Sequence, residues 1–334
     1  MRNLGAVVLL FICVFSVATA KAFTCWSDRG PAESNAGPAF GVYDDTLYLA
    51  MVSADRKHHI HVYKVRLENY KRAGILRKQG CYAGQRLPSR TSATPALTEY
   101  KGKLWMAFRS ADSSGYIYYQ SYDGYTWSMT KKTKFKTGAG PALVVYNDRL
   151  HMAWRENNGK QFYSASFDGK QWSVSEKLRA DHSRRAPTLA VFDNIEAVGG
   201  DDSFKGIYLA YQRDGRATVN YAIRQRAGWI YPKSGLKVMT AFTPALAVHG
   251  AFNSRLYEAA VTRGDDCGQV IIRHMGYEYP RFRWQTGRDP DVRTCKRPAL
   301  ISFGEYLVLG TNDPYPYGDR TWIAITFWKP EDVG

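Results

Sequence analysis

Short runs of apolar residues, separated by polar turns, recur along the whole chain. Two of the clearest are the second runs of their units, Lys103–Arg109 and Arg149–Arg155, and each is followed by a third run, Tyr116–Tyr122 and Gln161–Phe167. Runs of this length, rich in aromatic and β-branched residues, are typical of β-strands. No window of useful length has the 3.6-residue apolar period of a helix. The pattern therefore predicts an all-β protein and disfavours a helical solenoid.

A larger repeat organises these runs. Six segments open with a proline followed by small or apolar residues, at Pro38, Pro95, Pro141, Pro187, Pro244 and Pro298. The prolines are 57, 46, 46, 57 and 54 residues apart, and the units contain up to four short β runs. Four short strands repeated at this period indicate the blades of a β-propeller. The alternative is that the runs are similar strands of a two-sheet sandwich.

The ends of the chain suggest how the ring closes. The last unit stops at Thr321–Trp328 without a fourth run, while Cys25 and Trp26 lie shortly before the first repeat proline. Because other units place a tryptophan at a similar distance before the next proline, we expect the N-terminal segment around Trp26 to complete the last blade and remove an open edge. The predicted fold is a six-bladed β-propeller with four-stranded blades and an N-terminal strand closing the last blade.

The first twenty residues are typical of a secretory signal peptide. Arg2 precedes the apolar stretch Leu4–Val17, and Ala18–Ala20 is a small-residue cleavage site. We therefore expect residues 1–20 to be removed, residues 21–334 to form a single propeller domain, and the protein to be secreted. No other apolar run is long enough to span a membrane.

Four cysteines remain after the signal peptide. An even number in an exported chain predicts two disulfides. Cys267 and Cys295 fall in loops at the same rim of the predicted propeller, so we expect them to pair, which leaves Cys25 with Cys81 by elimination. The sequence leaves other pairings open. The spacing matches no zinc pattern, and we expect neither a metal nor a cofactor.

Two copies of a turn motif carry a family resemblance. Ser121–Trp127 and Ser166–Trp172 contain Asp-Gly before a tryptophan and resemble the Asp-box of sialidase-like propellers, although each is one residue short. The whole repeat is similar to those of secreted sialidase-related propellers and propeller lectins. The resemblance implies that the acids and tryptophans of the two turns, Asp123, Asp168, Trp127 and Trp172, are structural. The first-blade Phe/Tyr-Arg-Ile-Pro motif of sialidases is absent, and no catalytic residue can be assigned.

Charge adds a candidate binding surface. The chain has 46 Lys and Arg against 30 Asp and Glu, a formal net charge of +16. The turns between second and third strands and the connections into each first strand share one rim, where we expect these ligand-binding residues: Arg109, Arg155, Arg185, Arg213, Arg263 and Arg297. Arginine binds carboxylate or sulfate bidentately, and converging arginines focus a positive potential. The alternative is a solvated surface on which each arginine pairs with a neighbouring acid.

The preferred hypothesis is a lectin-like module that binds carbohydrate or another anionic extracellular ligand through this rim. One alternative is a sialidase-related glycoside hydrolase or a polysaccharide lyase with divergent catalytic residues, and another is an extracellular protein-interaction scaffold. Nucleic acid is disfavoured because the chain is predicted to be exported and has no recognised nucleic-acid module. The sequence predicts neither the ligand nor the oligomeric state.

Overall fold

The structure is a computed structural model whose described part is entirely β-strand, turn and irregular chain. It describes residues 21–24, 26–27, 30–31, 36–53, 57–65, 81–193, 205–232, 239–250, 254–262, 267–278, 281–286, 292–314 and 321–328. Across these ranges no helix occurs, and hence none that is long and apolar enough to cross a membrane. The predicted signal peptide, residues 1–20, lies outside the described residues.

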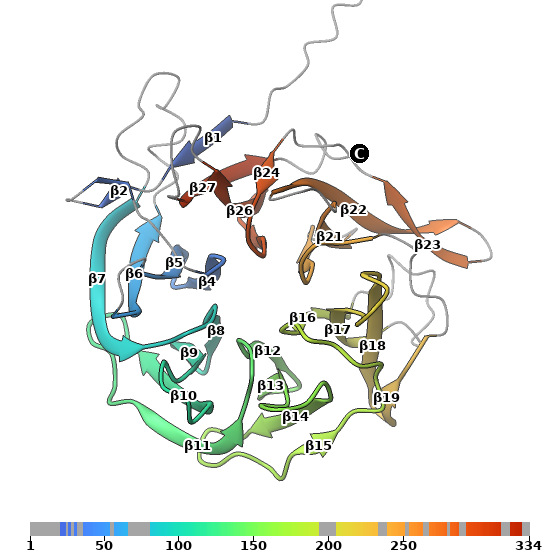
Figure 1. The fold of residues 1–334 in the computed structure, drawn as a ribbon, viewed down its shortest axis with the longest axis horizontal. Helices are drawn as coiled ribbons and strands as arrows, with labels where there is room; N and C mark the ends of the chain where they lie inside the picture. The colour runs from blue at the N-terminus through green and yellow to red at the C-terminus, as the bar shows by residue number, and fades with distance from the viewer. Residues whose placement is uncertain are drawn as a thin grey trace, which may run out of the picture.

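The strands form antiparallel sheets that radiate from a common centre, as in a β-propeller (Figure 1). The innermost strand of each sheet begins just after a repeat proline: β4 (Ala39–Tyr43), β8 (Ala96–Tyr100), β12 (Ala142–Tyr146), β16 (Thr188–Phe192), β20 (Ala245–His249) and β25 (Ala299–Phe303). The second strands are β5 (Thr46–Val52), β9 (Lys103–Arg109), β13 (Arg149–Arg155), β17 (Gly206–Gln212), β21 (Arg255–Val261) and β26 (Tyr306–Pro314). The third strands are β6 (His59–Val65), β10 (Tyr116–Tyr122), β14 (Phe162–Phe167), β18 (Val219–Gln225), β22 (Gly268–Glu278) and β27 (Thr321–Trp328). The outer strands are β7 (Cys81–Arg90), β11 (Lys131–Lys136), β15 (Glu176–Lys177), β19 (Gly228–Ile230), β23 (Arg281–Thr286) and β1 (Lys21–Thr24).

The prediction of six four-stranded blades is wrong, because five sheets have four strands and the sheet that contains β20–β23 has five. Its additional strand is β24 (Arg293–Thr294), which pairs with the start of β22 through Gly268 and Gln269. The physical reason is the length of β22. Its eleven residues extend beyond β23, which pairs only from Arg273 onward, so the first residues of β22 have a free edge that β24 occupies.

The N-terminal strand β1 pairs antiparallel with β27, from Lys21 opposite Phe327 to Thr24 opposite Ala324. The start of the chain therefore supplies the outer strand of the sheet that ends it, as the missing fourth run indicated. The placement of Trp26 in that strand is wrong. Trp26 lies in β2 (Trp26–Ser27), which pairs with β3 (Gly30–Pro31) in a separate two-stranded sheet.

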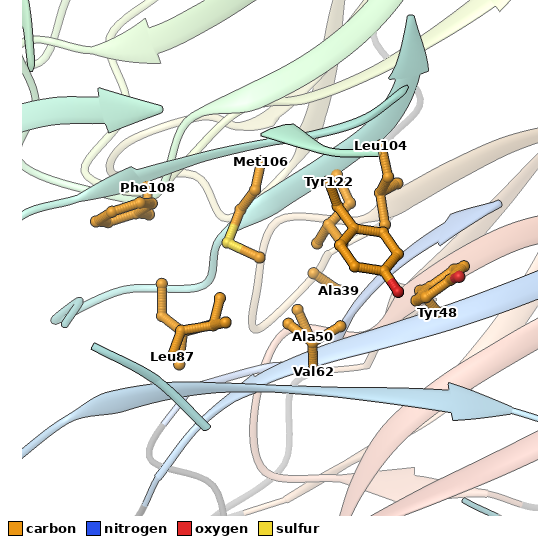
Figure 2. Close-up of a cluster of buried hydrophobic side chains, with 11 residues drawn as sticks. Ala39, Tyr48, Ala50, Val62, Leu87, Leu104, Met106, Phe108 and Tyr122 are labelled. Atoms are coloured by element: carbon orange, nitrogen blue, oxygen red, sulfur yellow. The ribbon is translucent and has the colours of Figure 1, made fainter. Parts of the chain in front are cut away.

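The core lies between neighbouring sheets. In β9, Leu104, Met106 and Phe108 are at most 2% exposed and face the preceding sheet, in a cluster with Ala50, Val62 and Leu87 (Figure 2). The residue between them, Ala107, belongs instead to the cluster shared with the following sheet. Alternation along a strand therefore serves two interfaces. Burying each large side chain of this kind contributes about 1.5–3 kcal/mol.

The two Asp-Gly turns have the structural role that the resemblance implied. The Asp123 Oδ1 accepts hydrogen bonds from the backbone N–H groups of Tyr125 at 2.9 Å and Thr126 at 2.8 Å. Asp168 makes the equivalent pair of bonds, and these backbone donors hold the pKa of both carboxyls below the usual range. The following glycines have φ of 100° and 103°, where an L side chain is strained.

Cys267 and Cys295 form a disulfide across 28 residues. It joins the residue before β22 to the residue after β24, beside the additional strand pairing. Cys25 lies outside the described residues, so the predicted pairing of Cys25 with Cys81 stays a prediction.

Candidate functional site

The rim that carries the predicted site is built on a repeated buried hydroxyl. A threonine or serine stands four residues before the proline in all six units, and Ser34 of the first unit lies outside the described residues. The other five are fully buried: Thr91, Thr137, Ser183, Thr240 and Thr294. The Thr137 hydroxyl donates to the carbonyl of Ala139 at 2.8 Å and accepts from its N–H at 3.2 Å, and Thr91 makes the same pair with Ala93. These local turns shape the connections into the inner strands. The hydroxyl residue at a fixed spacing before the proline is a sequence signal for these turns, and the sequence-based predictions did not include it.

Arg109 occupies a repeated structural position near the end of a second strand. Its Nε donates to the Thr137 carbonyl in the connection to the next sheet, at 2.9 Å. In other sheets Gln212 donates to the Thr240 carbonyl at 2.5 Å, and Asn312 donates to the Ala36 carbonyl at 3.4 Å. Each of these side chains hydrogen-bonds a backbone carbonyl in the connection to a neighbouring sheet. The regular spacing of Arg109 in the repeat is therefore explained by this contact between sheets.

The Arg155 side chain also hydrogen-bonds backbone carbonyls. Its guanidinium donates to the carbonyls of Glu156, at 3.0 Å, and Gly159, and its Nε is buried without a partner. Burial and the charge of Arg109 lower its pKa. Arg155 does not line any of the three larger hollows described below.

The strand register shows which residue of the next sheet corresponds to Arg155. Ala153 of β13 pairs with Ala142, and Ala210 of β17 pairs with Thr188, so the position of Arg155 corresponds to Gln212. Arg213 is one residue further along, in the turn after β17. Arg263 lies outside the described residues.

Four arginines line one hollow of about 520 Å³, which we call the basic rim pocket. Arg184 and Arg185 come from the connection into β16, and Arg213 and Arg216 from the turn between β17 and β18. Of these, Arg185 and Arg213 were predicted as ligand-binding residues. The pocket adds Arg184 and Arg216, which that prediction omitted although they lie beside the predicted pair in sequence.

Some of this charge is already neutralised. Asp214 is the single carboxylate among the described residues that line the pocket. It pairs with Lys160 at 2.5 Å and Arg184 at 3.2 Å, and the Lys160 hydrogen bond lowers its pKa. Arg213 pairs with Asp181 at 3.4 Å. Each of these pairs is solvent-exposed and contributes less than about 1 kcal/mol.

Two arginines of the pocket have no carboxylate partner among the described residues. Arg185 lies with its guanidinium carbon 5.6 Å from the centre of the Phe242 ring, and no carboxylate of the described residues lies within ion-pair distance of it. Arg216 is exposed and has no carboxylate partner in the described part of the chain either. The pocket therefore combines two uncommitted guanidiniums with an aromatic ring and the half-exposed side chain of Met239.

Arg297 lies apart from this pocket. It lines a cavity of about 450 Å³ that runs along the inner strands at the centre of the propeller, which we call the axial channel. Its walls are mostly apolar, and Arg297 and Glu99 are the charged residues among those lining it. The structure thus brings together Arg185 and Arg213, and separates them from Arg109, Arg155 and Arg297.

A third hollow of about 460 Å³, between β7 and the sheet of β8–β11, is lined by Arg90, Asp112 and the side chains of Phe108 and Tyr118. The Nε of Arg90 donates to the Lys57 carbonyl at 2.5 Å, and hydrogen bonds from Ser114 and Ser110 lower the pKa of Asp112. No group of three His, Cys, Asp or Glu able to hold a metal occurs among the described residues.

A buried Tyr–Glu pair also occurs, away from these hollows. Tyr221 donates to Glu258, and Arg273 binds the other carboxylate oxygen. Glu258 is fully buried, and burial raises the pKa of its carboxyl while lowering that of Arg273 to about 10. None of the three residues lines the axial channel, the basic rim pocket or the third hollow.

Comparison with known proteins identifies the fold. No family model matches the sequence, and no curated protein matches it. The Penicillium chrysogenum α-L-arabinanase complexed with arabinobiose is similar with a TM-score of 0.63 and 12% identity, over 95% of this chain and 100% of that chain. A variant of the Aleuria aurantia lectin in complex with Fucα1-6GlcNAc has a TM-score of 0.59 and 9% identity, over 88% and 96%.

The Trypanosoma rangeli sialidase in complex with the inhibitor DANA is also similar, with a TM-score of 0.57 and 10% identity, over 94% of this chain and 58% of that chain. The chain therefore has the β-propeller fold of these arabinanase, lectin and sialidase structures. At such identities the similarity extends to the fold alone, because one fold carries many functions.

Proposed function

We propose that this protein is an extracellular carbohydrate-binding propeller that holds an acidic glycan in the basic rim pocket. The observation that carries the proposal is the convergence of Arg185 and Arg216, neither with a carboxylate partner in the described residues, in a pocket that contains Phe242. Planar guanidiniums bind carboxylate and sulfate groups through two parallel hydrogen bonds. An aromatic ring offers an apolar face to the C–H side of a sugar. An acidic sugar presents both features to one pocket.

The fold supports this class of ligand. Similar solved propellers include a lectin bound to a fucosylated disaccharide and an arabinanase bound to arabinobiose. The predicted signal peptide and the Cys267–Cys295 disulfide are consistent with an oxidising, extracellular location.

Binding is favoured over hydrolysis by the position of the acidic groups. Catalysis on a glycoside requires carboxyl or Tyr–Glu groups within reach of the scissile bond. The Tyr221–Glu258 pair is buried between sheets, and Asp214 in the pocket is neutralised by Lys160 and Arg184. The described pocket therefore has cationic binding groups and no free carboxylate positioned for acid–base catalysis.

The test is binding of acidic and neutral oligosaccharides to the wild type and to the double variant Arg185→Gln/Arg216→Gln. The wild type is expected to bind sulfated, uronate or sialylated oligosaccharides, with affinity that falls as salt rises. The double variant is expected to lose affinity by roughly tenfold or more, because each guanidinium contributes a charge-assisted hydrogen-bonded pair. Binding is measured by glycan array, followed by calorimetry.

The matched control is Lys131→Gln/Lys134→Gln, which removes the same charge from the exposed outer strand β11. This variant is expected to bind like the wild type. Equal losses in both double variants would mean that general charge, rather than the pocket, attracts the glycan. Turnover of a sialoside or an acidic polysaccharide by the wild type would replace the proposal with a hydrolase or lyase.

A further inference from the structure

The residues immediately before the repeat prolines stand where the inner strands begin, and two of them, Thr94 and Arg297, line the axial channel. These residues are Gly37, Thr94, Gly140, Ala186, Thr243 and Arg297. Five of the six are small, and Arg297 alone has a long side chain.

Neighbouring members of this set contact each other closely. A Cβ on Gly140 would lie 2.3 Å from the carbonyl oxygen of Thr94, and a Cβ on Gly37 would lie 2.3 Å from that of Arg297. The Thr243 hydroxyl donates to the Ala186 carbonyl at 2.6 Å. Side chains at Gly37 and Gly140 would therefore collide with the backbone of the neighbouring residue of this set. The Arg297 side chain lines the axial channel.

The charge of Arg297 has no compensation in the described structure. Among the described residues, no carboxylate lies within ion-pair distance of its guanidinium and no hydrogen-bond acceptor contacts it. Glu99, the other charged residue of the channel, stands at the far end of an inner strand, whereas Arg297 stands just before one begins. Burial lowers the pKa of Arg297 to about 10, so the guanidinium is still protonated at neutral pH.

We propose that Arg297 binds a small oxyanion, a sulfate or carboxylate group, inside the axial channel. A partly buried guanidinium among prolines, alanines and leucines is destabilised unless a counter-charge accompanies it. The cavity of about 450 Å³ has room for such an anion together with water. A planar guanidinium presents two parallel N–H donors to two oxygens of one sulfate or carboxylate. The anion would lie near the start of the inner strand β25, which Arg297 precedes by two residues.

This site is separate from the glycan pocket of the proposed function. Arg297 does not line the basic rim pocket, and Arg185 and Arg216 do not line the axial channel. Each hypothesis therefore has its own variants, and either can fail without the other.

The test measures the unfolding temperature of the wild type and Arg297→Met against sulfate and, separately, acetate, with chloride replaced so that ionic strength is constant. The wild type is expected to show a saturable increase with at least one of the two anions, about 2 °C for each tenfold rise in concentration above the dissociation constant. Sulfate and acetate together distinguish an inorganic oxyanion from a carboxylate. Arg297→Met is expected to lose this increase.

Arg297→Met is also expected to be at least as stable as the wild type in the absence of both oxyanions, because the substitution removes an uncompensated charge from an apolar cavity. The control is Lys296→Met, which removes the adjacent charge outside the channel lining and is expected to respond to anions like the wild type. Equal responses in all three proteins, or failure of Arg297→Met to fold, would overturn the anion site. Glycan binding by Arg297→Met is expected to be unchanged.

Discussion

At the scale of single residues, Glu258 has an unusual position for a charged group, because its side chain has no exposed surface. Its carboxylate is fully buried between the third strand β18 and the neighbouring second strand β21, where Tyr221 and Arg273 both donate to it. A buried ion pair of this kind adds little net stability compared with apolar packing, because both charges lose their hydration. The hydrogen bonds instead help to align two sheets, since Tyr221 belongs to one sheet and Glu258 and Arg273 belong to the next.

Removal of one partner is predicted to cost much more than removal of both charged groups. Glu258→Leu removes the carboxylate that the buried Arg273 guanidinium binds, so we expect the unfolding free energy to fall by about 3–5 kcal/mol. The double variant Glu258→Leu/Arg273→Met is expected to recover most of that loss. Urea titration of the wild type, Glu258→Leu, Arg273→Met and the double variant measures these changes. If the double variant is as unstable as the sum of the single ones, the two residues do not act as a pair.

At the scale of elements, each outer strand has one edge on which no described strand of its own sheet pairs with it. The strand β11 alternates buried Thr133 and Phe135 with exposed lysines, and the ammonium groups of Lys132 and Lys136 lie 3.5 Å and 4.6 Å from the centre of the Tyr116 ring. Lysine at a sheet edge disfavours pairing with another strand, because its charge is repelled by an identical edge. The lysine run is therefore explained by edge protection.

Replacing two of these lysines by apolar residues is predicted to cause self-association without unfolding. Lys132→Val/Lys134→Val keeps good strand formers on an exposed face but removes the contact of Lys132 with the Tyr116 ring, so the unfolding free energy is expected to stay within about 1 kcal/mol of the wild type. Light scattering at increasing concentration is expected to show assemblies larger than those of the wild type. The control Lys132→Gln/Lys134→Gln stays polar and is expected to match the wild type. Identical scattering from both variants would contradict the edge role.

At the scale of the whole molecule, closure depends on strands distant in sequence. The strand β1 pairs with β27 along four residues on each side, so the first and last strands of the described chain complete one sheet (Figure 1). Without β1, the N–H and C=O groups of β27 on that side would lose their partners. A ring that closes in this way leaves no long exposed edge at its junction.

A chain that starts at residue 25 is predicted to be less stable than one that starts at residue 21. Loss of the β1 pairing is expected to lower the unfolding temperature by roughly 5 °C or more and to promote aggregation through β27. Calorimetry and light scattering on the two chains measure both effects. Equal unfolding temperatures would show that the β1–β27 pairing does not stabilise the ring.

Much of the fold followed from local pattern. The repeat prolines, the apolar runs and the two Asp-Gly turns identified the strand arrangement, because these features depend on nearby residues and on β-strand periodicity. The pairing of β24 with β22 could not be found in this way. It depends on how far β22 extends beyond β23, which is a property of the assembled sheet.

The candidate site was less accessible to sequence reasoning. Arg109, Arg185 and Arg297 share residue type and approximate place in the repeat, yet Arg109 ties two sheets together, Arg185 lies in the rim pocket and Arg297 lines the axial channel. Arginine is long and flexible, so its contacts depend on which carbonyls, acids and cavities surround it after folding.

The sequence by itself determined the repeated β architecture, the turn chemistry and the excess positive charge, since strand periodicity, positive-φ turns and ionisation are local properties. Only the tertiary structure decided the strand count of each sheet, the location of Trp26 outside the closing strand, and which arginines are satisfied by backbone carbonyls. These outcomes depend on side chains and strands brought together from distant parts of the chain, whose packing no local pattern specifies.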